Sequence, residues 1–349
     1  MSDRLSGRQL GVALFTGLLA PAAAVAGMDW RGALAAIPVV LAAAWCWCGL
    51  GKWVGGWVGA KWKLPTFIYI MWGILLSGAV LASAAERVTA PAGRGVEWVA
   101  LLLAVPVFCL VKGKAAVFGR TAEIFYLAMI AVLAFVLVFG GAQIRFGRLL
   151  EPTGEFWSAL LAAAGIGCSG VAAVLLWDGD GGMDRPKWMR WSGGEAVALL
   201  LMSVVTVGVL SPALAAQQER PFFVMTVGLG QTARVEGLVS AAWLLSEVTL
   251  CGLLLQCGRK LWGAMGFGWK RGAPWVLTVA AAGAALCFLK SGESVRWLCR
   301  ILPVGGLVLG GVLPAVYSLW ARWRKTEKRG AYLGERKGKK SRYWGQKEK

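Results

Sequence analysis

The sequence predicts an all-α polytopic membrane protein with about ten transmembrane helices. Its 349 residues are 58% hydrophobic and 16% charged, and the mean hydropathy is +0.62. One soluble core could not bury this much apolar surface, which argues against a soluble enzyme. The apolar residues also fall in blocks of about 20 residues with few charges, the length that spans a hydrocarbon core about 30 Å thick.

These blocks lie between charged or turn-rich breaks and define the ten helices. In chain order we expect helices at 9–27, 31–50, 64–85, 96–112, 120–141, 156–177, 195–216, 233–257, 272–290 and 297–320. They form one permease-like transmembrane domain, residues 1–320, followed by a basic, polar tail at 321–349 that we expect to be disordered. The competing interpretation of the first block is a cleavable signal peptide, because Arg4 and Arg8 precede an apolar run that ends in small residues at 22–27.

Basic residues gather in alternate breaks, so they predict an orientation. The side of the N-terminus would hold 27 of the 37 Lys and Arg. They are Arg4 and Arg8; Lys52, Lys61 and Lys63; Lys112, Lys114 and Arg120; Arg185, Lys187 and Arg190; Arg259, Lys260, Lys270 and Arg271; and 12 in the tail. We therefore expect a multi-pass protein of the cell membrane with both termini cytoplasmic. The same pattern accounts for the net charge of +19 without nucleic acid, and the tail is expected to bind anionic lipid.

The residues that usually hold metals are scarce. The chain has no His, which is the commonest metal ligand and the usual general base. Its eight Cys lie in or beside apolar blocks, where Cys acts as a small hydrophobic residue. We therefore expect no metal site, no cofactor and no disulfide framework.

The first and sixth predicted helices contain residues that weaken helical structure. Gly17 and Pro21 interrupt the first helix, and three Gly and a Ser lie in the sixth. In two halves of five helices these positions are equivalent, which is the pattern of a binding site in inverted-repeat transporters. The residues expected to contact a ligand are Thr16, Gly17, Ala20, Gly165, Gly167, Cys168, Ser169 and Gly170. The alternative is that the small residues only allow helices to pack closely.

Few acidic residues lie within the predicted helices. Glu247 lies well inside the eighth, where a lone carboxylate costs several kcal/mol. It should therefore face a cavity, be protonated or pair with a polar neighbour, and it is the candidate for proton or ion coupling. Glu123 and Glu195 lie close to helix ends, and we expect them at the membrane interface.

Three segments resemble the B-subunit family of bacterial spore nutrient germinant receptors, which belongs to the amino-acid/polyamine/organocation permease superfamily. The segment LSGRQL at 5–10 resembles the family's opening Ile-Ser-x-x-Gln, and GRTAEIF at 119–125 resembles its Gly-Arg-x-x-Glu entry to the fifth helix. The third segment, PFF at 221–223 with RVEGL at 234–238, resembles its external loop. The order and spacing of these short motifs carry the resemblance.

This resemblance implies a LeuT-like fold of five plus five inverted helices. It also implies a membrane subunit of the spore inner membrane that senses an amino acid or similar nutrient together with A and C subunits. The first rival is an ion-coupled amino-acid permease that uses Glu247. The second is a membrane scaffold without a ligand, since few polar side chains line the proposed site.

Overall fold

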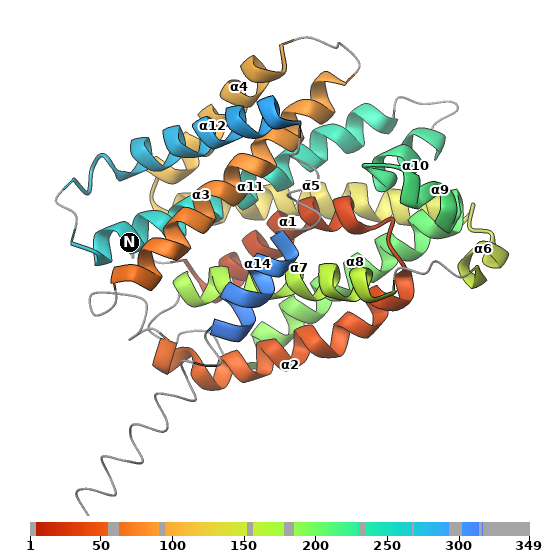
Figure 1. Cartoon of the computed structure of the whole chain (residues 1–349), viewed down its shortest axis with the longest axis horizontal. Coiled ribbons are helices and arrows are strands. Elements are labelled where there is room, and N and C mark those ends of the chain that lie inside the picture. Colours follow the sequence, from red (N-terminus) through yellow and green to blue (C-terminus); the bar gives the residue numbers. More distant parts are fainter. Residues whose placement is uncertain are drawn as a thin grey trace, which may run out of the picture.

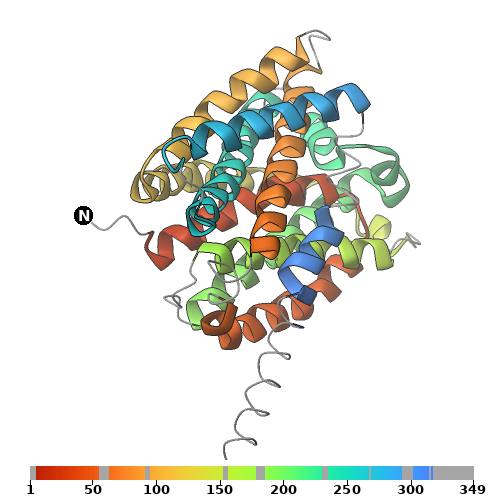
Figure 2. The ribbon, with the colours of Figure 1, turned by 60° about the vertical axis from the view of Figure 1, so that its left-hand side comes forward.

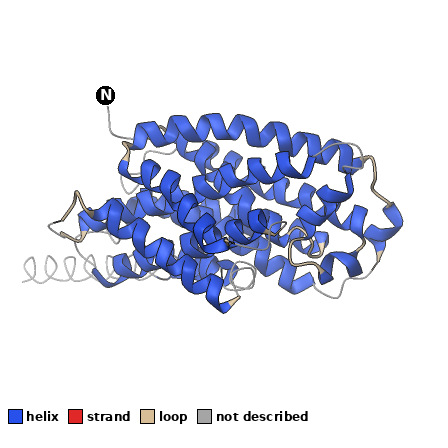
Figure 3. Cartoon of the chain, turned by 90° about the horizontal axis from the view of Figure 1, so that it is seen from above, coloured by secondary structure: helices blue, strands red, loops and turns tan. Residues whose placement is uncertain are grey.

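The computed structural model describes residues 5–54, 63–90, 95–151, 156–177, 185–229, 235–266, 269–292, 302–313 and 316. These residues form helices and short connections, and no strand occurs among them (Figure 3). The predicted tail at 321–349 lies outside the described residues, as do both ends of the tenth predicted helix, 297–320.

Each of the ten predicted helices overlaps a helix of the structure, and some of the ends differ by five to ten residues. The helices of the structure are α1 (Gly7–Val25), α2 (Trp30–Val54), α3 (Lys63–Thr89), α4 (Val96–Lys112), α5 (Ala115–Gly141), α6 (Phe146–Leu150), α7 (Phe156–Trp177), α8 (Arg185–Leu210), α9 (Pro212–Gln217), α10 (Pro221–Leu229), α11 (Val235–Ala264), α12 (Ala273–Ser291), α14 (Leu302–Gly306) and the π-helix η2 (Leu307–Val312). Six of them are long and apolar enough to cross a membrane, in whole or in part: α1, α3, α5, α8, α11 and α12.

The seventh predicted helix, 195–216, differs from the structure at both ends. Helix α8 begins ten residues earlier, at Arg185, and ends at Leu210. The turn follows from Ser211 and Pro212, because Pro lacks an N–H and disfavours helical geometry in the residue before it. Ser211 has a φ of 82°, and its hydroxyl accepts a hydrogen bond from the Leu214 N–H at the start of α9.

Two groups of helices pack against each other. Helices α1, α2, α7 and α8 form one group, and α3, α4, α11 and α12 form the other. In Figures 1 and 2 the first group lies toward the bottom of the view, where α2 is outermost, and the second toward the top, where α4 and α12 are outermost. Helix α1 packs on α11 across the boundary, and α5 contacts both of them. The α14–η2 segment packs on α7, and the Tyr69 hydroxyl of α3 donates a hydrogen bond to the Leu309 carbonyl at 2.6 Å.

The outer faces of the helices expose large apolar side chains. Leu102 of α4 is 67% exposed, and Ile124 and Leu127 of α5 are 67% and 69% exposed. Such a surface is unfavourable in water and matches the hydrocarbon of a bilayer. Glu123 of α5 is half-buried and pairs with Arg8, near the start of α1, at 3.6 Å.

Candidate functional site

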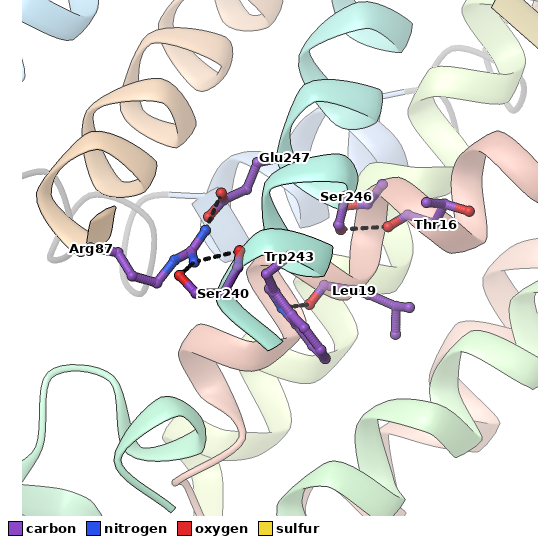
Figure 4. Close-up of polar contacts among 8 residues, drawn as sticks. Thr16, Leu19, Arg87, Ser240, Trp243, Ser246 and Glu247 are labelled. Carbon is purple, nitrogen blue, oxygen red and sulfur yellow. Dashed lines mark hydrogen bonds and ion pairs between the residues drawn. The ribbon is translucent and has the colours of Figure 1, made fainter. Parts of the chain in front are cut away.

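The middle of α1 is bonded to α11 by side chains that reach its carbonyl groups. Pro21 cannot donate to the carbonyl of Gly17 four residues earlier, so that carbonyl lacks its helical partner. The Ser246 hydroxyl of α11 donates to the neighbouring Thr16 carbonyl at 2.5 Å and lies 3.4 Å from the Gly17 carbonyl. The Trp243 indole N–H donates to the Leu19 carbonyl at 3.2 Å (Figure 4).

The two helices touch at this point. A Cβ atom on Gly17 would lie 3.1 Å from Cα of Leu250, so the glycine allows the close approach. The Thr16 hydroxyl is buried and has no hydrogen-bond partner among the described residues. A polar atom left unpaired in an apolar interior is costly, and such groups often mark functional positions.

A buried ion pair lies beside this contact. The Arg87 guanidinium of α3 donates to a Glu247 carboxylate oxygen at 2.5 Å, and the two side chains are 7% and 9% exposed. Arg87 also donates to the Ser240 hydroxyl at 2.5 Å and to its carbonyl at 3.0 Å (Figure 4). Its charge lies 4.7 Å from the centre of the Phe223 ring. Glu247 therefore pairs with a polar neighbour, one of the three expected outcomes.

A second ion pair joins α3 to the α9–α10 connection. Arg220, which precedes α10, donates to the Glu86 carboxylate at 2.9 Å. Burial lowers the pKa of Arg220, and the nearby charge of Glu86 opposes this effect. The two pairs follow each other on α3, since Glu86 and Arg87 are adjacent. They connect α3 both to α11 and to the segment that begins α10.

Helix α10 covers one end of α1 and α11. Pro221 packs so closely on Gly27, just after α1, that a Cβ atom there would lie within 2.2 Å of the proline ring. The rings of Phe222 and Phe223 lie 4.8 Å and 5.8 Å from the ring of Trp243. The aromatic segment noted in the sequence is therefore part of the wall around the α1–α11 contact.

The opposite end of α1 is held by the other two family-like segments. Ser6 and Gln9 form a capping box, in which each side chain bonds the other residue's backbone N–H at 3.2 Å. A Cβ atom on Gly119 of α5 would lie 2.4 Å from the Leu5 side chain and 2.9 Å from Gln9. The Arg8–Glu123 pair completes this contact. Segments 5–10 and 119–125 therefore meet in space.

For the sixth predicted helix, the structure favours the alternative that its small residues allow close packing. Helix α7 is continuous from Phe156 to Trp177, and the Ser169 hydroxyl donates to the Gly165 carbonyl four residues earlier. The small residues instead admit a neighbouring backbone, because a Cβ atom on Gly165 would lie 2.2 Å from the Pro303 carbonyl oxygen of α14. The Cβ of an Ala in place of Gly306 would clash with Ser169 in the same way.

The other predicted residues are distributed around α7 and α1. Gly167 packs on Val40 of α2, Cys168 is buried, and Gly170 continues the helix. Ala20 is half-buried on α1. Gly167 and Ala22 line a common cavity, but its volume is about 10 Å³, close to that of one water molecule and too small for an amino acid. The structure brings Thr16, Gly17 and Glu247 toward one region around α11.

Sequence reasoning missed two charged residues. The third predicted helix ends at residue 85, so Arg87 falls in the break after it, whereas α3 continues to Thr89 and includes Arg87. Glu195 was expected at the interface, but it is only 8% exposed. Because α8 begins at Arg185, Glu195 lies ten residues inside the helix rather than at its start.

Comparison with known proteins identifies the fold. The sequence matches no family model and no curated protein. The structure is similar to the manganese transporter of Eremococcus coleocola in complex with an aromatic bis-isothiourea compound, with a TM-score of 0.58, 13% identity, and coverage of 89% of this chain and 77% of that one. For a mutant of that transporter the TM-score is 0.53 and the identity 13%, with coverage of 88% of this chain and 78% of that one. The chain is an all-α polytopic membrane protein with a LeuT-like fold. The predicted fold class is confirmed.

The manganese cargo belongs to those transporters. The described part of the present chain contains no group of three His, Cys, Asp or Glu side chains that could hold a metal ion. Transition-metal sites are built from several such ligands. At 13% identity the likeness concerns the fold, and the function has to be argued from the residues of this chain.

Proposed function

We propose that the chain is the membrane subunit of a spore nutrient germinant receptor and binds an amino-acid-like nutrient where α1 meets α11. The observation that carries the proposal is the placement of the three family-like segments. Segments 5–10 and 119–125 meet at the start of α1, and Pro221 packs on Gly27 just beyond its end. Segments that are distant in sequence therefore meet at the two ends of α1, the helix in which a nutrient site is expected.

The polar groups at the centre of α1 suit the two charged ends of an amino acid. The carbonyls of Thr16 and Gly17 can accept from an ammonium group, and the hydroxyls of Thr16 and Ser246 can donate to a carboxylate. No charged side chain is then needed at the ligand. Ser246 occupies these carbonyls when α1 and α11 are in contact, so the nutrient takes its place.

Nutrient binding would separate the two helices. Gly17 and Leu250 touch in the closed arrangement, and a ligand can favour separation only by binding the separated state more tightly. Partner A and C subunits that contact either helix group would sense this change. We place the protein in the spore inner membrane, with its basic tail on anionic lipid.

Spores carrying variants of the chain test the proposal. Thr16→Val keeps the shape of the side chain and removes its hydroxyl, and it should abolish or greatly weaken germination in response to amino acids. Ser203→Ala is the matched control, because Ser203 is buried and its hydroxyl donates to the Leu199 carbonyl of its own helix. A normal response in Thr16→Val spores would contradict the site. A normal response after deletion of the gene would contradict the receptor role.

The buried carboxyl group of Glu247 favours a second candidate, an ion-coupled amino-acid permease. Glu247 would bind the coupling proton or ion, and its pairing with Arg87 would have to break during transport. Uptake of labelled amino acids into proteoliposomes, driven by a proton or sodium gradient and lost in Glu247→Gln, would favour this function. Binding without uptake would favour the receptor, and neither binding nor uptake would favour a scaffold.

A further inference from the structure

Glu195 is a second buried carboxyl group, distant from the Arg87–Glu247 pair. It lies on α8, is 8% exposed, and its Oε1 atom has no hydrogen-bond partner among the described residues. The side chain lines the cavity of about 10 Å³ between α1, α2, α7 and α8. The other lining residues are Ala22, Ala33, Ala36, Val40, Ala163, Ile166, Gly167, Ala196 and Leu199, all of them apolar or glycine.

The helices around the cavity bring no described cation to Glu195. Cys168 is the titratable group that faces it from α7. On α1, Arg8 pairs with Glu123 of α5. At the start of α2, Arg31 donates to the Leu150 carbonyl at 3.5 Å.

The remaining neighbours of α8 direct their polar groups elsewhere. Tyr126 of α5 packs in a ring cluster with Phe15 and Trp191. Helices α6, α9 and α10 contact α8 as well. Arg148 of α6 donates to the Val209 carbonyl near the end of α8, and Arg220 before α10 pairs with Glu86. On α8 itself, Arg190 is exposed to the surroundings. Among the described residues, none therefore supplies a counter-charge to an ionised Glu195.

An unpaired carboxylate in such an interior costs several kcal/mol, so the group must bind a positive species or a proton. Ca²⁺ and Mg²⁺ take about six or more oxygen ligands and Zn²⁺ takes four ligands, whereas the lining of the cavity offers one carboxyl group. The cavity also has room for about one water molecule. We propose that Glu195 is a proton-binding site, protonated while α1, α2, α7 and α8 are closely packed.

The position of the site gives the proton a role in conformational change. Glu195 is enclosed by all four helices of one group, so separation of these helices would admit water and stabilise the carboxylate. Proton release is then linked to opening of the group, and a higher pH favours the open state. The inference holds whether the chain senses a nutrient or transports one, because it requires no ligand at α1.

Infrared spectroscopy of the full-length protein in lipid nanodiscs tests the inference directly. A protonated carboxylic acid has a carbonyl stretch that is distinct from that of a carboxylate. We expect this band at neutral pH in the wild type, its loss in Glu195→Gln, and its retention in Glu97→Gln, which removes an exposed carboxyl at the start of α4. A wild-type spectrum in which Glu195→Gln removes no such band would overturn the proposal.

A second measurement needs no variant. Dicyclohexylcarbodiimide enters apolar regions and reacts with protonated carboxyl groups, and peptide mass spectrometry then locates the modified residue. We expect modification at Glu195, with less modification as pH rises, whereas absence of labelling at every pH would contradict a proton site. If sodium or another cation instead protects Glu195 and raises the Tm of the wild type but not of Glu195→Gln, the site binds that cation and the proposal fails.

Discussion

Arg87 and Glu247 show what a single sequence reveals about a buried charge. The carboxyl group could be recognised because it lies inside an apolar block, where an ionised group needs a partner. The partner could not be identified, because 160 residues separate the two and pairing depends on how α3 packs on α11. Thr16 and Gly17 are predicted as site residues from the Gly and Pro beside them, whereas the contact of Ser246 with them depends on tertiary packing.

Removing one member of this pair should cost far more than removing both. Arg87→Met leaves a buried carboxylate without compensation and should destabilise the protein by about 3–5 kcal/mol. The double variant with Glu247→Gln should recover much of that loss, as measured by a double-mutant cycle of unfolding in detergent. Arg8→Met is the control, because its exposed pair with Glu123 should contribute about 0–1 kcal/mol. Equal losses in the single and double variants would contradict the coupling.

Glu247→Gln replaces the carboxyl group by an uncharged amide and also tests the role of Glu247 in function. Glu247→Gln should change the nutrient response or transport while the protein remains inserted, and Glu247→Ala should do so at least as strongly because it also removes the hydrogen bond to Arg87. The readouts are germination or uptake, with membrane insertion checked by yield. Wild-type behaviour in both variants would reduce the pair to a structural contact.

At the scale of elements, glycine-rich helices had two possible interpretations, and packing decided between them. The residues 165–170 could unwind or could admit a neighbour, and the sequence did not distinguish these outcomes. In α7 the backbone stays helical because few partners other than its own carbonyls are available in an apolar interior. The space left by Gly165 is filled by the backbone of α14. The boundary at Ser211 was missed because apolar residues continue beyond it.

Enlarging Gly165 should therefore loosen the packing of α7 on α14. Gly165→Ala places a Cβ atom within 2.5 Å of the backbone of Pro303, which cannot move as a flexible side chain would. We expect a loss of about 1–3 kcal/mol and a lower Tm in detergent. Gly283→Ala in α12 is the matched control, because a Cβ atom there meets nothing within 4 Å and should be neutral or slightly stabilising. A Tm unchanged in Gly165→Ala would contradict this packing.

At the scale of the whole molecule, the fold class could be predicted because apolar length and charge placement reflect the bilayer. The grouping of α1, α2, α7 and α8 could not, since it depends on contacts between helices that are equally apolar. Two helix ends that the basic residues assign to the same side of the membrane lie close together in the structure. Arg259 at the end of α11 donates to the Val111 and Gly113 carbonyls at the end of α4, so two ends assigned to the cytoplasm meet.

This agreement supports a test of the predicted orientation. In a variant without native cysteines, single Cys residues replace Arg185 and Lys270, which lie on the predicted inner side, and Glu97, which lies on the outer side. A membrane-impermeant maleimide added to intact cells should label the Glu97→Cys protein at once and the other two only after permeabilisation, because 27 of the 37 Lys and Arg favour their side as cytoplasmic. Labelling of the Arg185→Cys protein in intact cells would show that the orientation is opposite to the predicted one. Helix α10 and the Arg220–Glu86 pair would then lie toward the cytoplasm. This result would argue against a receptor that binds external nutrients at the end of α1 on which α10 packs.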